Sequence, residues 1–469
     1  MAIIGRKEEQ EALRLCLESK QAEFLVVYGR RRVGKTYLIK EYFNQRFSFY
    51  ATGVASTDMK EQLGYFHDSL KEYGSTEKKQ PANWREAFAQ LKEILSLDSV
   101  ARDPVTGKRI VFIDEVPWMD TARSGFKTAL DHFWNSWASS QSDVLLIVCG
   151  SATSWIIENI LEDEGGFYDR VTRQIHLQPF SLAECEMYYA SKDIPFGRQE
   201  MIESYMVFGG IPFYLNLLDR RLSLAQNVEA LVFKENGQLH YEYDRLFRSL
   251  FKNPTKHFAI ISAIVQKRYG MTREEIQKAT KIGDGALLTK ALSELQQCGF
   301  IRKYRNFTTK KNGCIYQVID PFVLFCFEFM QDKKLSSWMS FVGKPGYYTW
   351  CGLAFEIVCL NHIKQLKAAL GISGVETSDY SWRSDDAQID LLIDRMDKVI
   401  NICEMKYSLK EYEITAEYEK NLAHKLEAFR DATGTKKALH ITMVTANGLA
   451  HNSHSGIVVN EIDGDALFE

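Results

Sequence analysis

One motif near the start of the chain constrains its fold more than any other feature. Residues 29–36, GRRRVGKT, fit the pattern G-x-x-x-x-G-K-[ST], which wraps the phosphates of ATP or GTP. The apolar run 24–28 before it is typical of a buried parallel strand, and residues 37–42 after it are typical of a helix. Backbone N–H groups of such a loop turn inward around phosphate oxygens, and the helix N-terminus adds partial positive charge. The motif therefore predicts a nucleotide-binding site.

The motif also assigns roles to its own side chains. We expect Lys35 to reach the β- and γ-phosphates and the Thr36 hydroxyl to ligate Mg²⁺. A glycine-rich turn that matches by chance is the alternative, but strand, helix and the Lys-Thr pair occur together here. The other loop residues expected to line the nucleotide are Gly29, Arg32, Val33 and Gly34.

A second apolar run ends in two acids. Residues 110–113 are apolar and directly precede Asp114 and Glu115. We expect Asp114 to hold the Mg²⁺ shell and Glu115 to orient or deprotonate the attacking water. Apolar residues before Asp-Glu are common, so this pattern gains its weight from the phosphate loop upstream. The adjacent glutamate favours hydrolysis over binding alone.

Two further positions leave alternatives open. The apolar run 144–150 ends at Ser151, which would either lie beside the γ-phosphate or cap the next helix. Arg170 and Arg173 follow. Either arginine could neutralise transition-state charge in a neighbouring subunit of a homo-oligomer, and surface solvation explains them almost as well.

Length and composition place these motifs in an ordinary globular protein. At 469 residues the chain should hold about three or four domains. The formal charge of −3 leaves any nucleic-acid surface to a local patch. Nine scattered cysteines without a C-x-x-C pair predict reduced core thiols. Because we find neither an N-terminal signal region nor an apolar run long enough to cross a membrane, we expect a soluble, cytoplasmic protein.

Changes of pattern divide the chain into four parts. Residues 1–180 alternate apolar strands with amphipathic helices and predict an α/β core with a doubly wound parallel sheet. Residues 181–252 show only helical spacing and predict a lid over the nucleotide. Residues 253–330 predict three short helices and a β-hairpin, the order of a winged helix. Residues 345–469 predict a separate α/β unit.

The predicted winged helix is locally basic. Between residues 256 and 311 there are twelve Lys and Arg residues and four acids, a net charge of +8. A basic helix and wing suit phosphate contacts on DNA, which we expect from the helix over residues 285–297 and from the wing. The alternative is that this segment only packs against the lid. The wing residues expected to contact DNA are Arg302, Lys303 and Arg305.

The last part of the chain carries another set of acids. Glu356 lies in an apolar helical stretch, and Asp390 lies in a strand-like run. Glu404 and Lys406 lie in the next strand-like run and project from the same face, because side chains alternate along a strand. Carboxylates in such a set can hold one or two Mg²⁺ ions, and the lysine can position water for phosphodiester cleavage.

The motifs together resemble the archaeal-type ATPase family, a branch of P-loop ATPases near the AAA+ and STAND groups. The resemblance rests on the phosphate loop, the acid pair, residues 4–6 (IGR) and residues 209–212 (GGIP). It implies that Arg6 lies near the adenine and that Pro212 approaches the nucleotide from the lid.

Longer members of that family end in a domain that looks like a PD-(D/E)XK nuclease, with a restriction-endonuclease-like fold. Ile389 stands where the name-giving proline would be. The resemblance implies ATP hydrolysis coupled to DNA binding and Mg²⁺-dependent DNA cleavage. The alternative is an ATP-dependent signalling or scaffold switch whose C-terminal domain binds nucleic acid or protein without cutting. The residues that match the nuclease pattern are Glu356, Asp390, Glu404 and Lys406.

Overall fold

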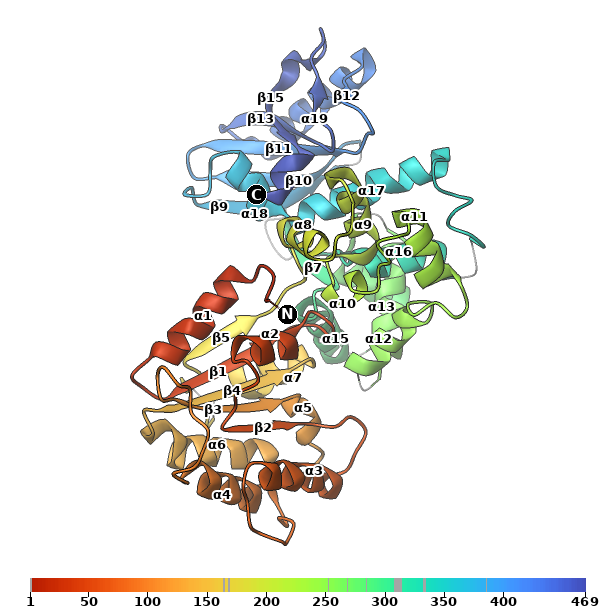
Figure 1. Cartoon of the computed structure of the whole chain (residues 1–469). Coiled ribbons are helices and arrows are strands. Elements are labelled where there is room, and N and C mark those ends of the chain that lie inside the picture. The colour runs from red at the N-terminus through yellow and green to blue at the C-terminus, as the bar shows by residue number, and fades with distance from the viewer. Residues whose placement is uncertain are drawn as a thin grey trace. The chain divides into compact units, whose positions relative to one another are not determined.

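The chain divides into two compact units, Met1–Gln178 and Pro179–Glu469 (Figure 1). This division lies close to residue 180, where the alternating strand–helix pattern is expected to end. No helix in the described part of the chain is long and apolar enough to cross a membrane. The computed structural model describes residues 2–162, 165–167, 169–251, 253–267, 269–283, 285–307, 314–331, 335–384 and 386–469.

The first unit is built on a five-stranded sheet in the order β2-β3-β4-β1-β5. All of its neighbouring strands are parallel, as the sequence predicts. Three central strands are buried at every position, because helices cover both faces of the sheet. The strands are β1 (Glu23–Tyr28), β2 (Phe49–Thr52), β3 (Arg109–Asp114), β4 (Val144–Gly150) and β5 (Arg173–His176).

Helices α3 (Met59–Glu72), α4 (Trp84–Leu95) and α6 (Phe126–Ser136) cover one face of this sheet (Figure 1). Their aromatic side chains interlock; the rings of Trp84 and Phe126 meet edge to face with centroids 4.9 Å apart. The remaining elements of the unit are α1 (Lys7–Glu18), α2 (Lys35–Tyr42), α5 (Val116–Met119), α7 (Thr153–Ile156), η1 (Ala138–Ser140) and η2 (Ile157–Leu161).

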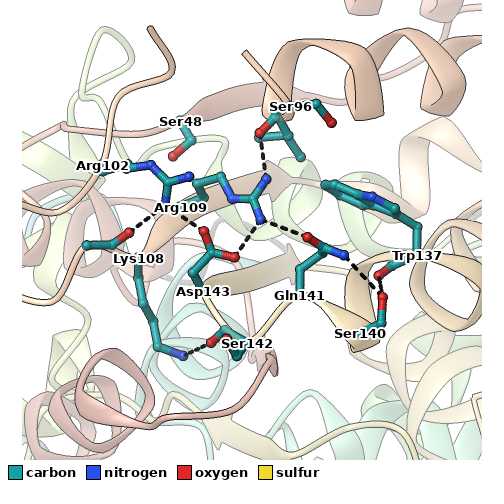
Figure 2. A network of polar contacts seen from close by, with 12 residues as sticks. Ser48, Ser96, Arg102, Lys108, Arg109, Trp137, Ser140, Gln141, Ser142 and Asp143 are labelled. Carbon is teal, nitrogen blue, oxygen red and sulfur yellow. Dashed lines mark hydrogen bonds and ion pairs between the residues drawn. The ribbon is translucent and has the colours of Figure 1, made fainter. Parts of the chain in front are cut away.

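A charged network closes the amino edge of the sheet, where β3 and β4 begin. Figure 2 shows Asp143 between the guanidinium groups of Arg102 and Arg109. Arg109 donates to Asp143 Oδ1 at 2.5 Å, and Arg102 donates to Asp143 Oδ2 at 2.5 Å. Burial opposes ionisation here, but the two guanidinium groups outweigh it and hold the pKa of Asp143 below its ordinary value. At this edge the negative charge of Asp143 is therefore compensated by two arginines.

The second unit begins with helices only, as expected for residues 181–252. A tight break separates α9 from α10 at Gly210, whose φ is +66°. A Cβ atom there would lie 2.2 Å from the Phe180 carbonyl oxygen, so only glycine fits. The elements are α8 (Leu182–Ser191), α9 (Arg198–Phe208), α10 (Pro212–Leu215), α11 (Leu224–Val228), η3 (Glu229–Phe233) and α12 (Glu242–Leu250).

The predicted order of three helices and a hairpin follows. Thr272 caps the second helix: its side chain accepts from the Glu275 N–H, and the Glu275 side chain accepts from the Thr272 N–H, which together form a capping box. Four charged residues of the basic segment, Arg268, Asp284, Lys310 and Lys311, lie outside the described residues. The elements are α13 (Thr255–Val265), β6 (Met271–Thr272), α14 (Arg273–Thr280), α15 (Gly285–Gln297), β7 (Ile301–Asn306) and β8 (Cys314–Val318).

The C-terminal part does not form the separate unit that the sequence suggests. Strand β7 of the hairpin pairs in parallel with β9 (Thr377–Arg383), so hairpin and C-terminal strands share one eight-stranded sheet. Its order is β15-β13-β11-β10-β9-β7-β8-β6. Phe307, just after β7, packs its ring on Phe429, with centroids 5.1 Å apart. The hairpin is thereby anchored in the C-terminal core.

That core places helices on a mixed sheet. Strand β10 is antiparallel to its two neighbours, β9 and β11, whereas β11, β13 and β15 run parallel to one another. The remaining elements are α16 (Pro321–Phe329), α17 (Pro345–Asn361), α18 (Ile363–Ala369), β10 (Gln388–Arg395), β11 (Val399–Lys406), β12 (Tyr412–Glu413), α19 (Ala416–Thr433), β13 (Ala438–Thr445), β14 (Leu449–Ala450), η5 (Ser455–Ile457), β15 (Val458–Asp463) and η6 (Gly464–Phe468).

Candidate functional site

The phosphate loop joins β1 to α2 at the carboxyl edge of the first unit's sheet. Gly29 has a φ of +145°, and a Cβ atom there would lie 2.3 Å from the Leu177 carbonyl oxygen. Gly34, with a φ of +96°, is the N-cap of α2 and offers no side chain to the first N–H groups of that helix. These N–H groups are the ones that bind phosphate in such loops.

Arg6 contacts the phosphate loop. The family resemblance places this residue near the adenine. Its guanidinium donates to the Val33 carbonyl oxygen at 3.4 Å and forms an ion pair with Glu9 at 3.6 Å. Its backbone is left-handed, with a φ of 54°, and so is that of Arg32 within the loop, at 74°. The contact joins Arg6 to the phosphate loop, while its proximity to an adenine stays a prediction.

Lys35 is buried and curls back over its own loop. Its ammonium donates to the carbonyl oxygens of Gly29 at 2.8 Å and Arg30 at 2.9 Å. Its third hydrogen bond goes to Ser151 Oγ at 3.0 Å. All three acceptors are neutral, so the positive charge of Lys35 remains available to an anion.

The acid pair lies beside the loop. Thr36 Oγ1 donates to Asp114 Oδ2 at 2.7 Å, and the Glu115 N–H donates to Asp114 Oδ1 at 2.9 Å. Burial raises the pKa of Asp114 above its ordinary value, and the hydrogen bond from Thr36 offsets only part of this. Among the described residues, neither Asp114 nor Glu115 has a salt bridge. A hydroxyl and a carboxylate oxygen side by side are the hard donors that Mg²⁺ prefers.

Ser151 connects Lys35 with Glu115. Its hydroxyl accepts from Lys35 and donates to Glu115 Oε1 at 2.5 Å, while its N–H donates to Glu115 Oε2 at 3.0 Å. The N-cap of α7 is Ala152, without a side-chain cap, so Ser151 does not cap that helix. Between the two alternatives open from the sequence, the structure favours a place in the site.

Strand order explains why these residues meet. Strand β4 lies between β1 and β3, and the three strands are parallel. The residues that follow them, the phosphate loop, Ser151 and Glu115, therefore reach the same edge of the sheet. Glu115 has a left-handed backbone with a φ of 48°, which turns its side chain back toward Ser151. We call Lys35, Thr36, Asp114, Glu115 and Ser151 the carboxyl-edge site.

His176 is a neighbour of this site that sequence reasoning missed. It ends β5 and stacks on the Tyr28 ring, with centroids 4.6 Å apart. Burial, and then the charge of Lys35, lower the pKa of His176. The only signal in the sequence is a histidine at the end of a short polar strand, which is too weak to single it out.

Two other predicted site residues are not among those that the first unit brings to this edge: Arg170 lies elsewhere in that unit, and Pro212 belongs to the second unit. Arg170 is exposed and lies just before Thr172, whose N–H donates to the Phe24 carbonyl oxygen near the start of β1. It therefore lies toward the amino edge, and its role in a neighbouring subunit stays a prediction. Pro212 begins α10 in the second unit, so its approach to the nucleotide also stays a prediction.

In the C-terminal core, Glu404 has partners that the sequence does not predict. Lys425 Nζ donates to Glu404 Oε1 at 2.5 Å, and the Tyr418 hydroxyl donates to Oε2 at 2.9 Å. Both partners belong to α19. Lys406 Nζ lies 5.0 Å from the centroid of the Tyr418 ring. We call Glu404, Lys406, Tyr418 and Lys425 the Glu404 cluster.

The two other predicted metal ligands have different surroundings. Asp390 Oδ1 accepts from Gln388 Nε2 at 2.6 Å. Glu356 lines a cavity of about 130 Å³ together with Lys267 and Gln317. Within the described ranges, no three His, Cys, Asp or Glu side chains come together in a group that could hold a metal ion. The structure does not bring Glu356, Asp390 and Glu404 together in such a group, and α19 supplies a cation and a hydroxyl to Glu404.

The hairpin corrects one of the expected DNA contacts. Residues alternate along β7, so Lys303 and Arg305 are exposed while Arg302 is half-buried. Arg302 donates to Gln317 Oε1 at 2.8 Å and stacks on the Tyr304 ring at 4.2 Å. Burial lowers the pKa of Arg302. This arginine supports the joint between hairpin and C-terminal sheet and does not face a ligand.

One match to a known protein family covers the carboxyl-edge site. Residues 4–218 match the family model described as an ATPase domain predominantly from Archaea. This part of the chain is similar to that ATPase domain. It includes every residue of the carboxyl-edge site and extends to α10 of the second unit.

Two proteins of Methanocaldococcus jannaschii are similar in sequence. The uncharacterized protein MJECL04 is 24% identical over 428 residues, which covers 88% of this chain and 90% of that protein. The uncharacterized ATP-binding protein MJ0423 is 44% identical over 43 residues, 9% of this chain and 73% of that protein.

Two solved structures are similar in coordinates. The Walker-type ATPase PABY2304 of Pyrococcus abyssi has a TM-score of 0.47 and 19% identity, covering 70% of this chain and 96% of that one. The Aeropyrum pernix ORC2 protein, in ADPNP and ADP complexes, has a TM-score of 0.43 and 14% identity, covering 71% of this chain and 95% of that one.

Proposed function

We propose that this protein is an ATP-driven switch that hydrolyses ATP at the carboxyl-edge site. The proposal rests on one observation above all: the Ser151 hydroxyl links Lys35, the phosphate-binding lysine, to Glu115, the candidate base. A change at the phosphates is thereby passed to the group that activates water.

The residues of the site divide the work of hydrolysis. Thr36 and Asp114 would hold Mg²⁺, and the ion would supply positive charge for the phosphate oxygens. Lys35 exchanges the neutral carbonyls of its loop for phosphate oxygens, because hydrogen bonds between two charged groups are the stronger ones. The Ser151 hydroxyl, no longer held by Lys35, turns toward the γ-phosphate. Glu115 is then released to take the proton of the attacking water.

Isosteric variants test this division. Glu115→Gln keeps the shape but removes the base, so turnover should fall by about 10²–10⁴-fold while ATP binding persists. Lys35→Met should weaken ATP binding by roughly 10- to 100-fold, since it removes a charged hydrogen-bond donor. Ser151→Ala should lower turnover with ATP binding retained, and Ser154→Ala in the same turn is the matched control. A Glu115→Gln protein that hydrolyses ATP at the wild-type rate would refute the assignment of the base.

We also propose that the basic segment over residues 256–311 binds DNA. Support comes from its exposed cations, and from acids that are paired within the segment. Glu275 is held by Lys267 at 2.6 Å, and Glu294 is held by His257 at 2.7 Å. Phosphate contacts are what such a surface offers. Besides Lys267, which pairs with Glu275, the exposed cations among the described residues of this segment are Lys278, Lys281, Lys290, Lys303 and Arg305.

Salt dependence tests the DNA proposal. Replacing Lys303 and Arg305 by alanine should weaken DNA binding and reduce the slope of log K against log salt by about 2, since each lost phosphate contact lowers it by about 0.9. Arg302→Gln should leave that slope unchanged, because this side chain is half-buried. An unaltered slope in the double variant would place the DNA surface elsewhere.

DNA cleavage is not part of the proposal. Glu404, one of the three expected metal-binding carboxylates, is already paired with the ammonium of Lys425, which repels a divalent ion at the same carboxylate. The alternative reading of the sequence, a switch whose C-terminal domain binds without cutting, agrees better with this arrangement.

A further inference from the structure

The Glu404 cluster contains a buried carboxylate that is paired with a lysine. The Glu404 side chain is only 7% exposed, and its partner Lys425 is 18% exposed. A carboxylate removed from water in this way is strongly unfavourable unless a cation and hydrogen bonds compensate it. In metal sites a divalent ion supplies that compensation. Here an ammonium group supplies it at 2.5 Å.

The second oxygen of Glu404 is also occupied. Tyr418 donates its hydroxyl to Oε2 at 2.9 Å. Burial, and then the charge of Glu404, raise the pKa of Tyr418, so the hydroxyl keeps its proton and remains a donor. Each oxygen of Glu404 therefore already has a donor from α19, and the ammonium charge of Lys425 repels a divalent ion at the same carboxylate.

The packing of α19 fixes the position of both donors. Tyr418, Leu422, Lys425 and Phe429 follow one another at helical spacing and form a single stripe. Leu422 and Phe429 are fully buried in the C-terminal core. The ammonium of Lys425 is therefore carried to Glu404 by a face of the helix that cannot turn away without opening the core.

We infer that Lys425 is a built-in replacement for a divalent cation, and that the Glu404 cluster is a metal-free site. The cluster holds two ammonium groups: that of Lys425 pairs with Glu404, and that of Lys406 lies over the Tyr418 ring. Its chemistry is that of a fixed ion pair beside a second cation, which can contact an anion but cannot assemble a two-metal centre. This inference does not depend on the proposed ATP hydrolysis, because it concerns residues outside the ATPase domain.

Thermal unfolding of the full-length, nucleotide-free protein with and without Mn²⁺ tests this inference. Mn²⁺ should leave the transition of the wild type unchanged. Lys425→Met should lower it by roughly 5–10 °C, since it strands a buried carboxylate. Mn²⁺ should recover part of that loss, because the vacated position accepts a cation.

Two further variants make the test decisive. The double variant Glu404→Gln/Lys425→Met should recover stability without metal and ignore Mn²⁺, whereas Lys420→Met, an exposed lysine of the same helix, should behave like the wild type. Wild-type protein that Mn²⁺ stabilises through Glu404, so that Glu404→Gln removes the effect, would overturn the inference. So would a Lys425→Met protein that neither Mn²⁺ nor Glu404→Gln rescues, because Lys425 would then act by packing alone. Should Lys425→Met fail to fold, the wild-type and Glu404→Gln comparison still decides.

Discussion

The two acidic motifs of this chain fold into opposite electrostatic arrangements. At the carboxyl-edge site, Asp114 and Glu115 are held by hydroxyl and N–H donors, and their charge is left without a cation among the described residues. In the C-terminal core, Glu404 is held by the ammonium of Lys425. Under the proposed function the first arrangement accepts Mg²⁺ and ATP, whereas in the second the charge of Glu404 is already paired within the protein.

The amino edge of the first unit's sheet gives an internal standard for this comparison. Asp143 belongs to the same sheet as Asp114, yet two arginines hold its pKa below the ordinary value while burial raises that of Asp114. Within the part of the chain that the structure describes, the acid at one edge of the sheet is paired with cations, and the acids at the opposite edge are not. Acids whose charge is left uncompensated mark the place where a ligand supplies the missing cation.

The largest expected difference is in turnover. Asp114→Asn should lower ATP hydrolysis by roughly 10- to 100-fold, since it weakens the oxygen set that holds the metal. Glu404→Gln should leave the rate within about twofold, because its charge is already used by Lys425. Steady-state phosphate release measures both. Equal losses in the two variants would erase the distinction between the sites.

The next effect concerns pH and the second unit. The Leu182 N–H donates to His362 Nε2 at 3.0 Å, which requires a neutral ring, and burial lowers the pKa of His362 to about 4. The unfolded chain binds this proton from about pH 6.5 downward, so stability should fall by up to about 3 kcal/mol as the pH drops from 6.5 to 4. His362→Gln should flatten this dependence in denaturant titrations.

An exposed histidine gives the control for that measurement. His424 is half exposed, and its replacement by glutamine should leave the pH dependence as in the wild type. If the loss between pH 6.5 and 4 persists in His362→Gln, other groups carry it.

A smaller effect is the shift of the thermal unfolding temperature, which should have opposite signs for two acids at opposite edges of the first unit's sheet. Asp114→Asn should raise the thermal transition of the first unit, because ionised Asp114 is destabilising above its folded pKa. Asp143→Asn should lower it, because that carboxylate stabilises the fold above pH 3.8 and loses this contribution on protonation. We expect shifts of roughly 2–4 °C in scanning calorimetry. Shifts of the same sign would contradict the comparison.

Local motifs made the first site predictable. The phosphate loop, Asp114 and Glu115 sit at the ends of apolar strands, and parallel strands bring their carboxyl ends together. Ser151 could not be decided from sequence, because only the position of β4 between β1 and β3 turns it toward Lys35 and Glu115. Strand order is a property of the whole sheet and leaves no mark at a single residue.

The surroundings of Glu404 could not be predicted from the sequence for a related reason. Glu404 and Lys406 form the expected local pattern, but the partners of Glu404 lie on a helix that begins ten residues after the strand ends. The sequence of residues 404–406 does not indicate these partners. The shared sheet was missed in the same way, since the pairing of β7 with β9 joins segments about 75 residues apart.

Direct counting of bound Mn²⁺ by electron paramagnetic resonance tests the central claim most closely. With a non-hydrolysable ATP analogue, the full chain should bind one ion; Asp114→Asn should weaken the binding of this ion, and Glu404→Gln should leave it unchanged. Without nucleotide, no tightly bound ion is expected. An ion that binds without nucleotide and is lost in Glu404→Gln would contradict the account.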